Sequence, residues 1–315
     1  MFCLDLHSED PFFNLAADEY FFRQGSEEYL IIGINSPAVV IGKHQSPHME
    51  ADTRFVSTNG IPVIRRISGG GTVFHDPGNI NFSFILNSLP GRQVDFRKYL
   101  APVMDFLAGL GVKVSFEGKN DLKINGLKIS GNAEHVWRNR VLHHGTLLFD
   151  SDLANLGKSL RKDNSYYFSS AVKSNPSKVV NLKQFLPGIE SAGILKRKMM
   201  GYFLDAFPGN SELILNSEID REIEALAASK YRTWEWNYAY GPAYSITKKI
   251  KLQDETPTLK LAVSNGIINE CSMTGSGVSA EINSALKGIR HMPEAVATAL
   301  SEVLELTGDE VYKFF

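Results

Sequence analysis

Short runs rich in β-branched and aromatic residues follow one another between residues 29 and 86, and this pattern constrains the fold more than any other feature of the chain. Gly, Pro, Asn and Ser separate the runs, which is typical of strands joined by turns. The expected strands are Tyr29–Ile34, Ala38–Ile41, Val63–Ile67 and Asn81–Leu86. The sequence therefore predicts a β-sheet in the first third of the molecule.

Helical patterns precede and follow these strands. Asp10 can cap a helix over Pro11–Gln24, proline suits its first position, and apolar residues recur at helical spacing. A second helix is expected over Phe96–Leu110, ending at Gly111. Together these elements indicate an α+β fold, with a central mixed or antiparallel sheet flanked by helices.

More strands are expected after the second helix. They are Val112–Phe116, Asp121–Ile124, Lys128–Glu134 and Val141–Phe149. Asn125-Gly126 lies between two of them and is a strong hairpin signal. After Asp150 the pattern is mostly helical, most clearly in Met199–Phe207 and Glu218–Lys230. The sheet is therefore expected to end near residue 149, where helices take over.

The chain is long enough for two domains, because 315 residues exceed what one hydrophobic core usually organises. An aromatic stretch, Tyr231–Tyr240, leads to Gly241-Pro242, and a small α+β unit is expected beyond it. Its elements are strands near Ile246–Leu252, Leu259–Val263 and Ile267–Met273 and helices near Ile282–Leu286 and Pro293–Leu306. We predict a large domain over residues 1–243 and a small one over residues 244–315.

Charge and cysteine content exclude several classes of protein. The net charge is −2 and the basic cluster Lys248-Lys249-Ile250-Lys251 is short, so no nucleic-acid partner is expected. Cys3 and Cys271 lack the spacing of a zinc site or a disulfide framework. The N-terminus lacks the pattern of a secretory signal, and no window reaches the roughly 20 apolar residues of a membrane span. We expect a cytoplasmic protein without a membrane partner.

The most unusual stretch runs from Arg65-Arg66-Ile67-Ser68-Gly69-Gly70-Gly71 to Thr72-Val73-Phe74-His75-Asp76-Pro77-Gly78-Asn79. Consecutive glycines are entropically costly, and they allow a backbone to approach a ligand and direct several N–H groups at an anion. The two arginines add charge that suits carboxylate or phosphate. The spacing matches neither the P-loop nor the dinucleotide-binding loop. The alternative is a flexible hairpin with a solvated charge pair.

A second stretch extends from Lys119-Asn120-Asp121 through Asn125-Gly126-Leu127-Lys128-Ile129-Ser130-Gly131-Asn132-Ala133, and His143-His144-Gly145-Thr146 follows it. Lys128 lies among apolar and small residues, where an unpaired ammonium would be costly to desolvate. A bound anion is one possible counter-charge. The alternative is a strand lysine that points to water.

These two stretches, in this order, resemble the lipoate protein ligase family, in which an RRxSGGGxVxHDxGN segment precedes an NDxxxxGxKISG segment and then HHGTLL. The similarity extends to further segments along most of the chain. They are Ser36-Pro37-Ala38-Val39-Val40-Ile41-Gly42-Lys43-His44-Gln45, Lys178-Val179-Val180-Asn181-Leu182 and Trp234-Glu235-Trp236-Asn237-Tyr238. Biotin ligases and octanoyltransferases of the same superfamily share single pieces of this pattern.

The resemblance implies a two-step reaction. Lipoate and ATP give lipoyl-AMP and pyrophosphate, and the acyl group then passes to one lysine of a lipoyl carrier domain, in an E2 subunit of a 2-oxoacid dehydrogenase or in the glycine cleavage H protein. Residues 1–243 would be the catalytic domain and residues 244–315 an accessory domain. ATP, Mg²⁺ and lipoate are the implied small molecules.

The resemblance also implies the site residues. Lys128 would be catalytic, bridging the lipoyl carbonyl oxygen and the α-phosphate. Residues implied to bind lipoate or ATP are Arg65, Arg66, Ser68, Gly69, Gly70, Gly71, Thr72, Val73, His75, Asp76, Asn79, Asn120, Asp121, Ser130, Gly131, Ala133, His144, Gly145 and Thr146. Asp121 is the candidate ligand of Mg²⁺.

Several assignments stay open at this level. His75, Asp76 and Asn79 could brace the loop or contact nucleotide, and His144 could be a buried histidine bonded to backbone. Asn120 and Asp121 could bind either ribose or Mg²⁺. An arginine that the family often carries after the lysine segment is absent from Ala133-Glu134-His135, and Lys43, Lys119 or Arg138 could replace it.

Two other functions compete with the ligase. One is an ATP-independent lipoyl or octanoyl transferase that uses preformed lipoyl-AMP or an acyl carrier. A thioester route would need an accessible thiolate, and both cysteines lie far from the motif segments. The other is a non-catalytic protein that binds lipoate or its adenylate, which would not require the cation of Lys128.

Overall fold

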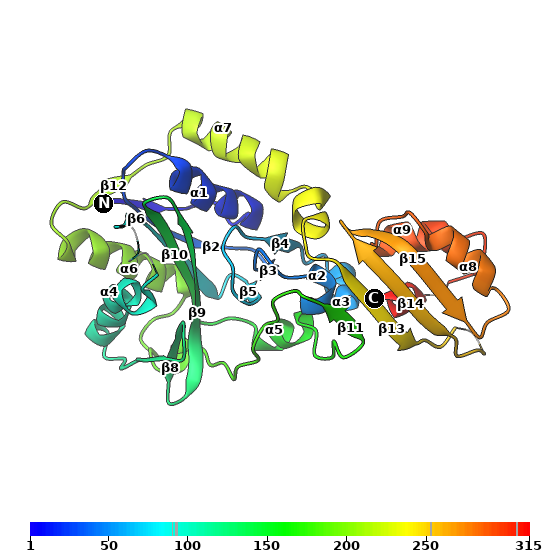
Figure 1. The fold of residues 1–315 in the computed structure, drawn as a ribbon. Coiled ribbons are helices and arrows are strands. Elements are labelled where there is room, and N and C mark those ends of the chain that lie inside the picture. Colours follow the sequence, from blue (N-terminus) through cyan, green and yellow to red (C-terminus); the bar gives the residue numbers. More distant parts are fainter. Residues whose placement is uncertain (90, 92–93, 253, 307) are drawn as a thin grey trace. The chain divides into compact units, whose positions relative to one another are not determined.

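The computed structural model describes residues 1–89, 91, 94–252, 254–306 and 308–315 (Figure 1). Contacts divide the chain into two compact units. Unit 1 comprises Met1–Lys43, Ile64–Gly157 and Ser174–Arg232, and unit 2 comprises His44–Val63, Lys158–Lys173 and Thr233–Phe315. Unit 2 thus takes in two segments that come from earlier in the sequence than its main part. The division into a catalytic domain, 1–243, and an accessory domain, 244–315, stays a prediction.

The strands of unit 1 form an eight-stranded sheet within the described residues. In spatial order they are β12 (Ser211–Leu213), β1 (Phe2–Asp5), β2 (Tyr29–Ile34), β6 (Asn79–Asn87), β10 (Arg140–Leu148), β9 (Leu127–Trp137), β8 (Asp121–Ile124) and β7 (Ser115–Glu117). Strand β1 is parallel to both of its neighbours, and the other pairs are antiparallel. The predicted central mixed sheet flanked by helices is confirmed.

Helices cover the sheet on both faces. Helices α1 (Pro11–Arg23) and α7 (Ser217–Leu226) lie side by side, and α4 (Phe96–Gly109) and α6 (Ala192–Ala206) bury the main apolar core against the sheet (Figure 1). Successive residues of a strand face opposite ways. In β10, accordingly, His143 packs against Tyr99 of α4, with 5.5 Å between ring centroids, whereas His144 lies 3.3 Å from Asp18 of α1. The sheet therefore has an apolar α4 face and a more polar α1 face.

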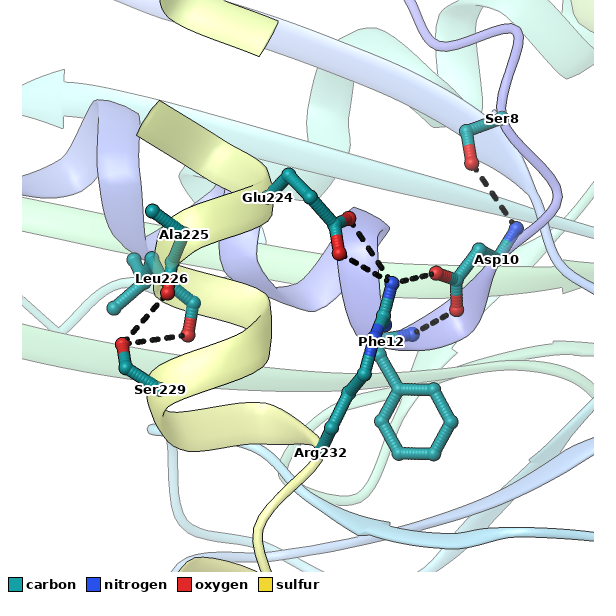
Figure 2. A network of polar contacts seen from close by, with 8 residues as sticks. All are labelled: Ser8, Asp10, Phe12, Glu224, Ala225, Leu226, Ser229 and Arg232. Atoms are coloured by element: carbon teal, nitrogen blue, oxygen red, sulfur yellow. Dashed lines mark hydrogen bonds and ion pairs between the residues drawn. The ribbon is translucent and has the colours of Figure 1, made fainter. Parts of the chain in front are cut away.

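Arg232, the last residue of unit 1, ties the start of α1 to α7 (Figure 2). Its Nη2 donates to Asp10 Oδ2 at 2.7 Å and to both carboxylate oxygens of Glu224 at 3.0 Å. Asp10 also accepts from Phe12 N at 2.9 Å, as expected for the predicted cap of α1. These side chains are partly exposed, so the network orients the two helices more than it stabilises the fold.

A three-stranded sheet in the order β4 (Val63–Arg65), β3 (Ala38–Ile41) and β5 (Val73–His75) carries the Gly-rich segment. That segment connects β4 to β5, so its two ends are fixed on the two outer strands of one small sheet, on either side of β3. The sequence predicted β3 with its observed bounds, and it predicted β4 two residues too long at its C-terminal end. The Gly-rich loop is therefore held on a rigid base.

Unit 2 has its own sheet and core. Its strands β11 (Tyr167–Ser169), β13 (Tyr244–Lys249), β14 (Thr258–Ser264) and β15 (Ile267–Thr274) are antiparallel. The helices of this unit are α2 (Pro47–Glu50), α3 (Thr53–Thr58), α8 (Ser279–Leu286) and α9 (Pro293–Leu300). In its core the Tyr244 hydroxyl donates to His291 Nδ1 at 2.6 Å, and burial lowers the pKa of His291 to about 4. The predicted small α+β unit is thus joined by β11, which comes from earlier in the sequence.

The expectation of a mostly helical pattern after Asp150 was wrong for residues 160–191. Helix α5 (Leu153–Ser159) is followed there by irregular chain with only β11 and the short helix η1 (Leu182–Gln184). Pro176, Pro187 and Gly188 explain this, because they interrupt regular hydrogen bonding. The remaining short helices are η2 (Ala227–Tyr231), η3 (Glu235–Ala239) and η4 (Glu310–Phe314). No helix in the described part of the chain combines the length and the hydropathy needed to span a bilayer.

Candidate active site

Arg66 holds the Gly-rich loop from the inside. Its Nη2 donates to the carbonyl oxygens of Gly69 at 2.6 Å and Gly71 at 2.7 Å, and its Nε donates to Ser68 Oγ at 2.9 Å. With these carbonyls turned toward the guanidinium, the N–H groups of Gly69, Gly70 and Gly71 donate no hydrogen bond to the described residues. Three consecutive amides without a protein acceptor can receive an anion.

Arg65 is fully buried and braces the adjoining backbone. Its Nη1 donates to the carbonyl oxygens of Gly42 at 3.2 Å and Lys43 at 2.9 Å. A Cβ at Gly42 would overlap the carbonyl oxygen of Gly70, and Gly70 itself has a φ of +86°. Glycine is therefore needed at both positions, one for the close approach and one for the backbone conformation.

Lys128 lies near the start of β9, just after the turn of the β8–β9 hairpin. Asn125 and Gly126 form the turn with φ values of 51° and 77°, which confirms the predicted hairpin. The hairpin places Lys128 Nζ 2.8 Å from Asp121 Oδ1, and the two side chains are 22% and 18% exposed. Lys128 is thus neither a solvated strand lysine nor an unpaired buried one, since a carboxylate from the same motif faces it.

The two motif segments meet on the α1 face of the sheet. The Cβ position of Gly131 lies 3.1 Å from Lys128 Nζ and 3.7 Å from Val73 Cγ1. Two residues along β9, Ala133 Cβ lies 3.5 Å from the Cβ position of Gly70. Small residues of β9 therefore form a floor beneath the Gly-rich loop, and the Lys128 ammonium lies at one end of that floor.

A chain of side-chain hydrogen bonds connects α1 to the loop. His144 Nε2 lies 2.6 Å from Ser68 Oγ, and His144 Nδ1 lies 3.3 Å from Asp18 Oδ2. Because the Asp18 carboxylate can only accept, it favours the tautomer of His144 with its proton on Nδ1, and Nε2 then accepts from the Ser68 hydroxyl, whose oxygen accepts from Arg66 Nε. His144 is therefore bonded to side chains rather than to backbone, and Asp18 was not among the residues predicted from the sequence.

His75 is a buried, neutral acceptor. Asn14 Nδ2 donates to Asn35 Oδ1 at 2.7 Å, so Asn35 presents its NH₂ group to His75 Nδ1 at 2.9 Å. Burial, aided by the nearby charge of Arg66, lowers the pKa of His75 to about 3. The ring thus braces β5, and contact with nucleotide stays a prediction for this residue.

Other predicted site residues also support the backbone around the site. Asp76 accepts from Gly78 N at 3.0 Å and Asp152 N at 2.6 Å, and buried Asn79 donates to Asn81 Oδ1 at 2.8 Å. These contacts fix the turn between β5 and β6 and bond it to the backbone of Asp152. Asp76 and Asn79 therefore brace the loop, and any contact of theirs with nucleotide stays a prediction.

Asn132 contacts several of the predicted site residues, although it was not itself predicted to belong to the site. Asn120 Nδ2 donates to its carbonyl oxygen, and Asn132 Nδ2 donates to Ser130 Oγ at 3.1 Å. A Cβ at Gly145 would overlap Asn132 Oδ1, which explains the glycine there, and Thr146 Oγ1 accepts from Gly131 N at 3.3 Å. Asn132 lies inside the lysine motif, so its position in that segment was the signal that could have found it.

His135 occupies the place where an arginine was expected. Its pKa is lowered by burial first and by the charge of Lys43 second, so Lys43 acts on the same spot. Arg138 instead stacks over the ring of Trp137, 4.3 Å from its centroid, and Lys119 is exposed. Of the three cations considered as replacements, Lys43 is the one whose charge acts on His135.

Comparison with known proteins defines the class of this fold and site. Residues 10–204 match the family model described as the lipoyl protein ligase A/B catalytic domain. Lipoate-protein ligase LplJ of Bacillus subtilis is 33% identical over 302 residues, covering 93% of this chain and 91% of the relative. Lipoate–protein ligase 1 of Staphylococcus aureus is 34% identical over the same coverage. The chain belongs to the lipoate protein ligase family and is a ligase.

Solved structures agree with this assignment. A bipartite lipoate protein ligase of Thermoplasma acidophilum, described with its E2 lipoyl domain, has a TM-score of 0.64 at 25% identity, covering 75% of this chain and 95% of that one. A second T. acidophilum structure, with bound lipoic acid, gives 0.63 at 25% identity over 75% and 98%. A lipoate-protein ligase A bound with ATP gives 0.62 at 25% identity over 75% and 97%.

Proposed function

We propose that this protein activates lipoate with ATP to form lipoyl-AMP and pyrophosphate, and then transfers the lipoyl group to a lysine of a lipoyl carrier domain. The observation that carries the proposal is that β9 lies next to both the Lys128 ammonium, near Gly131, and the Gly-rich loop, near Ala133. The amides of Gly69 to Gly71 in that loop donate to no described residue. Such a site offers fixed positive charge and N–H donors where a carboxylate must react with a phosphate.

The chemistry requires orientation and charge stabilisation rather than a protein nucleophile. In the first step a lipoate carboxylate oxygen bonds to the α-phosphorus while the bond to pyrophosphate breaks. In the second, the carrier amine bonds to the acyl carbon, loses a proton, and AMP leaves. Negative charge grows near the same acyl phosphate in both steps, so Lys128 would contribute to each.

Asp121 is the carboxylate best placed to hold Mg²⁺ with the triphosphate. Magnesium binds through one or two carboxylates and substrate phosphates, so a cage of protein ligands is not required. Consistent with that, the described residues contain no group of three or more His, Cys, Asp or Glu side chains suited to a metal. When bound, the ion would neutralise phosphate charge. Asp121 would be its ligand from the protein, and the adjacent Lys128 would be a second cation beside it.

The relatives support the identity of the substrates. Structures in the family hold lipoic acid in one case and ATP in another, and a third is described with an E2 lipoyl domain. We propose E2 subunits and the H protein as carriers, in the cytoplasm. A thioester route has little support, because burial raises the pKa of both Cys3 and Cys271, the latter to about 11.

Pyrophosphate release tests the proposal. Wild type is expected to release pyrophosphate from Mg-ATP only when lipoate is present, and then to lipoylate an added apo carrier domain. Lys128→Ala should lose about 100-fold or more of this rate. Lys123→Ala is the matched control. Lys123 lies on β8 of the same hairpin, is similarly exposed, and forms an ion pair of 3.2 Å with Glu117 of β7.

Two results would reject the ligase. Carrier lipoylation from synthetic lipoyl-AMP without any lipoate-dependent release of pyrophosphate would make the protein a transferase. Binding of lipoate without either reaction would make it a binding protein. Equal losses in the two lysine variants would remove the special role of Lys128.

A further inference from the structure

Ser174 contacts the Gly-rich loop at the point where its unsatisfied amides end. Ser174 Oγ accepts a hydrogen bond from Thr72 N at 2.7 Å. The Cβ position of Gly71 lies 3.1 Å from Ser174 Oγ and 3.4 Å from its Cα, so the serine packs directly on the loop. Thr72 is therefore the first amide after the glycines that a protein oxygen satisfies, and Ser174 marks the limit of the anion-accepting stretch.

The same short segment, residues 174–180, also holds the backbone of Lys128. Lys128 N donates to Lys178 O at 2.8 Å, and Val180 N donates to Lys128 O at 3.0 Å. We call residues 174–180 the strap. Its C-terminal end is fixed, because Val180 is buried in the core and Asn181 exchanges hydrogen bonds of 3.1 and 2.9 Å with the backbone of Ser151.

We propose that Ser174 is a positioning residue that sets the distance between the loop amides and the Lys128 ammonium through the strap. The inference rests on the proposed function, since it assumes that the amides and Lys128 act on one acyl phosphate. Ser174 at one end of the strap bonds to the loop, and Lys178 and Val180 at the other end bond to the backbone of Lys128. Five residues separate Ser174 from Val180, which is buried in the core. Without the Ser174 hydroxyl the loop loses the hydrogen bond from Thr72 N to this anchored segment.

Three variants test the role of the hydroxyl. Ser174→Ala removes it, Ser174→Thr keeps it, and Ser177→Ala is the matched control because Ser177 is exposed on the same strap. One hydrogen bond is worth about a 2- to 12-fold effect. We expect Ser174→Ala to raise the KM for ATP by about that factor in lipoate-dependent pyrophosphate release, with the KM for lipoate unchanged and Ser174→Thr close to wild type.

This split in KM distinguishes positioning from loss of folded protein, which would lower kcat and leave both KM values unchanged. Hydrogen exchange gives a readout that does not depend on activity: the peptide containing Thr72 should exchange faster in Ser174→Ala than in Ser177→Ala. If Ser174→Ala does not fold, Gly71→Ala tests the same contact from the loop side and should also raise the KM for ATP.

Each unfavourable outcome has a definite meaning. A KM for ATP that is unchanged in Ser174→Ala, an equal rise in Ser177→Ala, or failure of Ser174→Thr to restore the wild-type value would overturn the inference. Absence of lipoate-dependent pyrophosphate release in wild type would instead reject the proposed function, and faster hydrogen exchange at Thr72 would then still report the structural link.

Discussion

The neutrality of His75 leads to a quantitative prediction about acid stability. Asn14 fixes the amide of Asn35, and the NH₂ group of Asn35 then donates one hydrogen bond to His75 Nδ1, which must accept it. Protonation of His75 would place a donor against a donor in a buried site. The folded state therefore resists the proton, with a pKa of about 3 for His75 against an ordinary value near 6.5.

The sign follows from linkage between protonation and folding. The unfolded chain binds a proton at His75 as the pH falls below about 6.5, whereas the folded chain does not until about pH 3. Stability contributed by this residue is therefore complete above pH 6.5 and is lost as the pH falls through that window. With these two pKa values the loss between pH 7 and pH 5 is about 2 kcal/mol.

Urea unfolding of wild type and His75→Asn at pH 5, 6, 7 and 8 measures this loss. Asparagine places an acceptor near the position of Nδ1 and does not titrate, so the variant should show about 2 kcal/mol less pH dependence between pH 7 and 5, whatever its absolute stability. The same replacement at exposed His7 controls for the substitution itself. Identical pH dependence in wild type and His75→Asn would refute the argument, as would a His75 ring that titrates near pH 6.5 by NMR.

Three further predictions concern the site. Asp121→Asn should raise the Mg²⁺ concentration needed for pyrophosphate release and slow that step about tenfold, with a smaller effect on transfer from preformed lipoyl-AMP; equal effects on both steps would exclude a role with the triphosphate. Gly145→Ala should destabilise the fold by about 1–3 kcal/mol in thermal unfolding, because a Cβ there would overlap Asn132 Oδ1, and an unchanged melting temperature would contradict the packing. Arg66→Lys should raise the KM for ATP about tenfold or more, since one ammonium cannot span the acceptors of the guanidinium, and a wild-type KM would show that the loop is held otherwise.

Local features were predictable from the sequence because their causes are local. Helix α1 begins where Asp10 and Pro11 stand, and the β8–β9 hairpin turns at Asn125-Gly126. Both rest on the conformational preferences of a few adjacent residues. The Gly-rich segment was likewise recognisable as unusual, since consecutive glycines are costly without a reason, whereas Lys128 was selected only through the resemblance of its segment to the family.

Features that depend on residues far apart in the sequence could not be predicted from it. Asp18 contacts His144 across 126 positions of sequence, and nothing in an apolar helix shows which acidic residue will face the sheet. Ser174 lies in an irregular segment rich in Ser, Asn and Pro, where composition predicts only a loop. Strand β11 is three residues long and pairs with β13, so its place in the sheet of unit 2 is set by packing rather than by a hydrophobic pattern.

Arg66 and Lys128 differ in how many of their hydrogen-bond donors are occupied by protein groups. The planar guanidinium of Arg66 meets acceptors at Gly69, Gly71 and Ser68, and all of these are protein groups that define the loop. The Lys128 ammonium has three donors, and the described ion pair with Asp121 engages one of them. A cation that shapes a site must have its bonds occupied before the substrate arrives, whereas a cation that stabilises reacting charge must retain donors for it. We propose the first role for Arg66 and the second for Lys128.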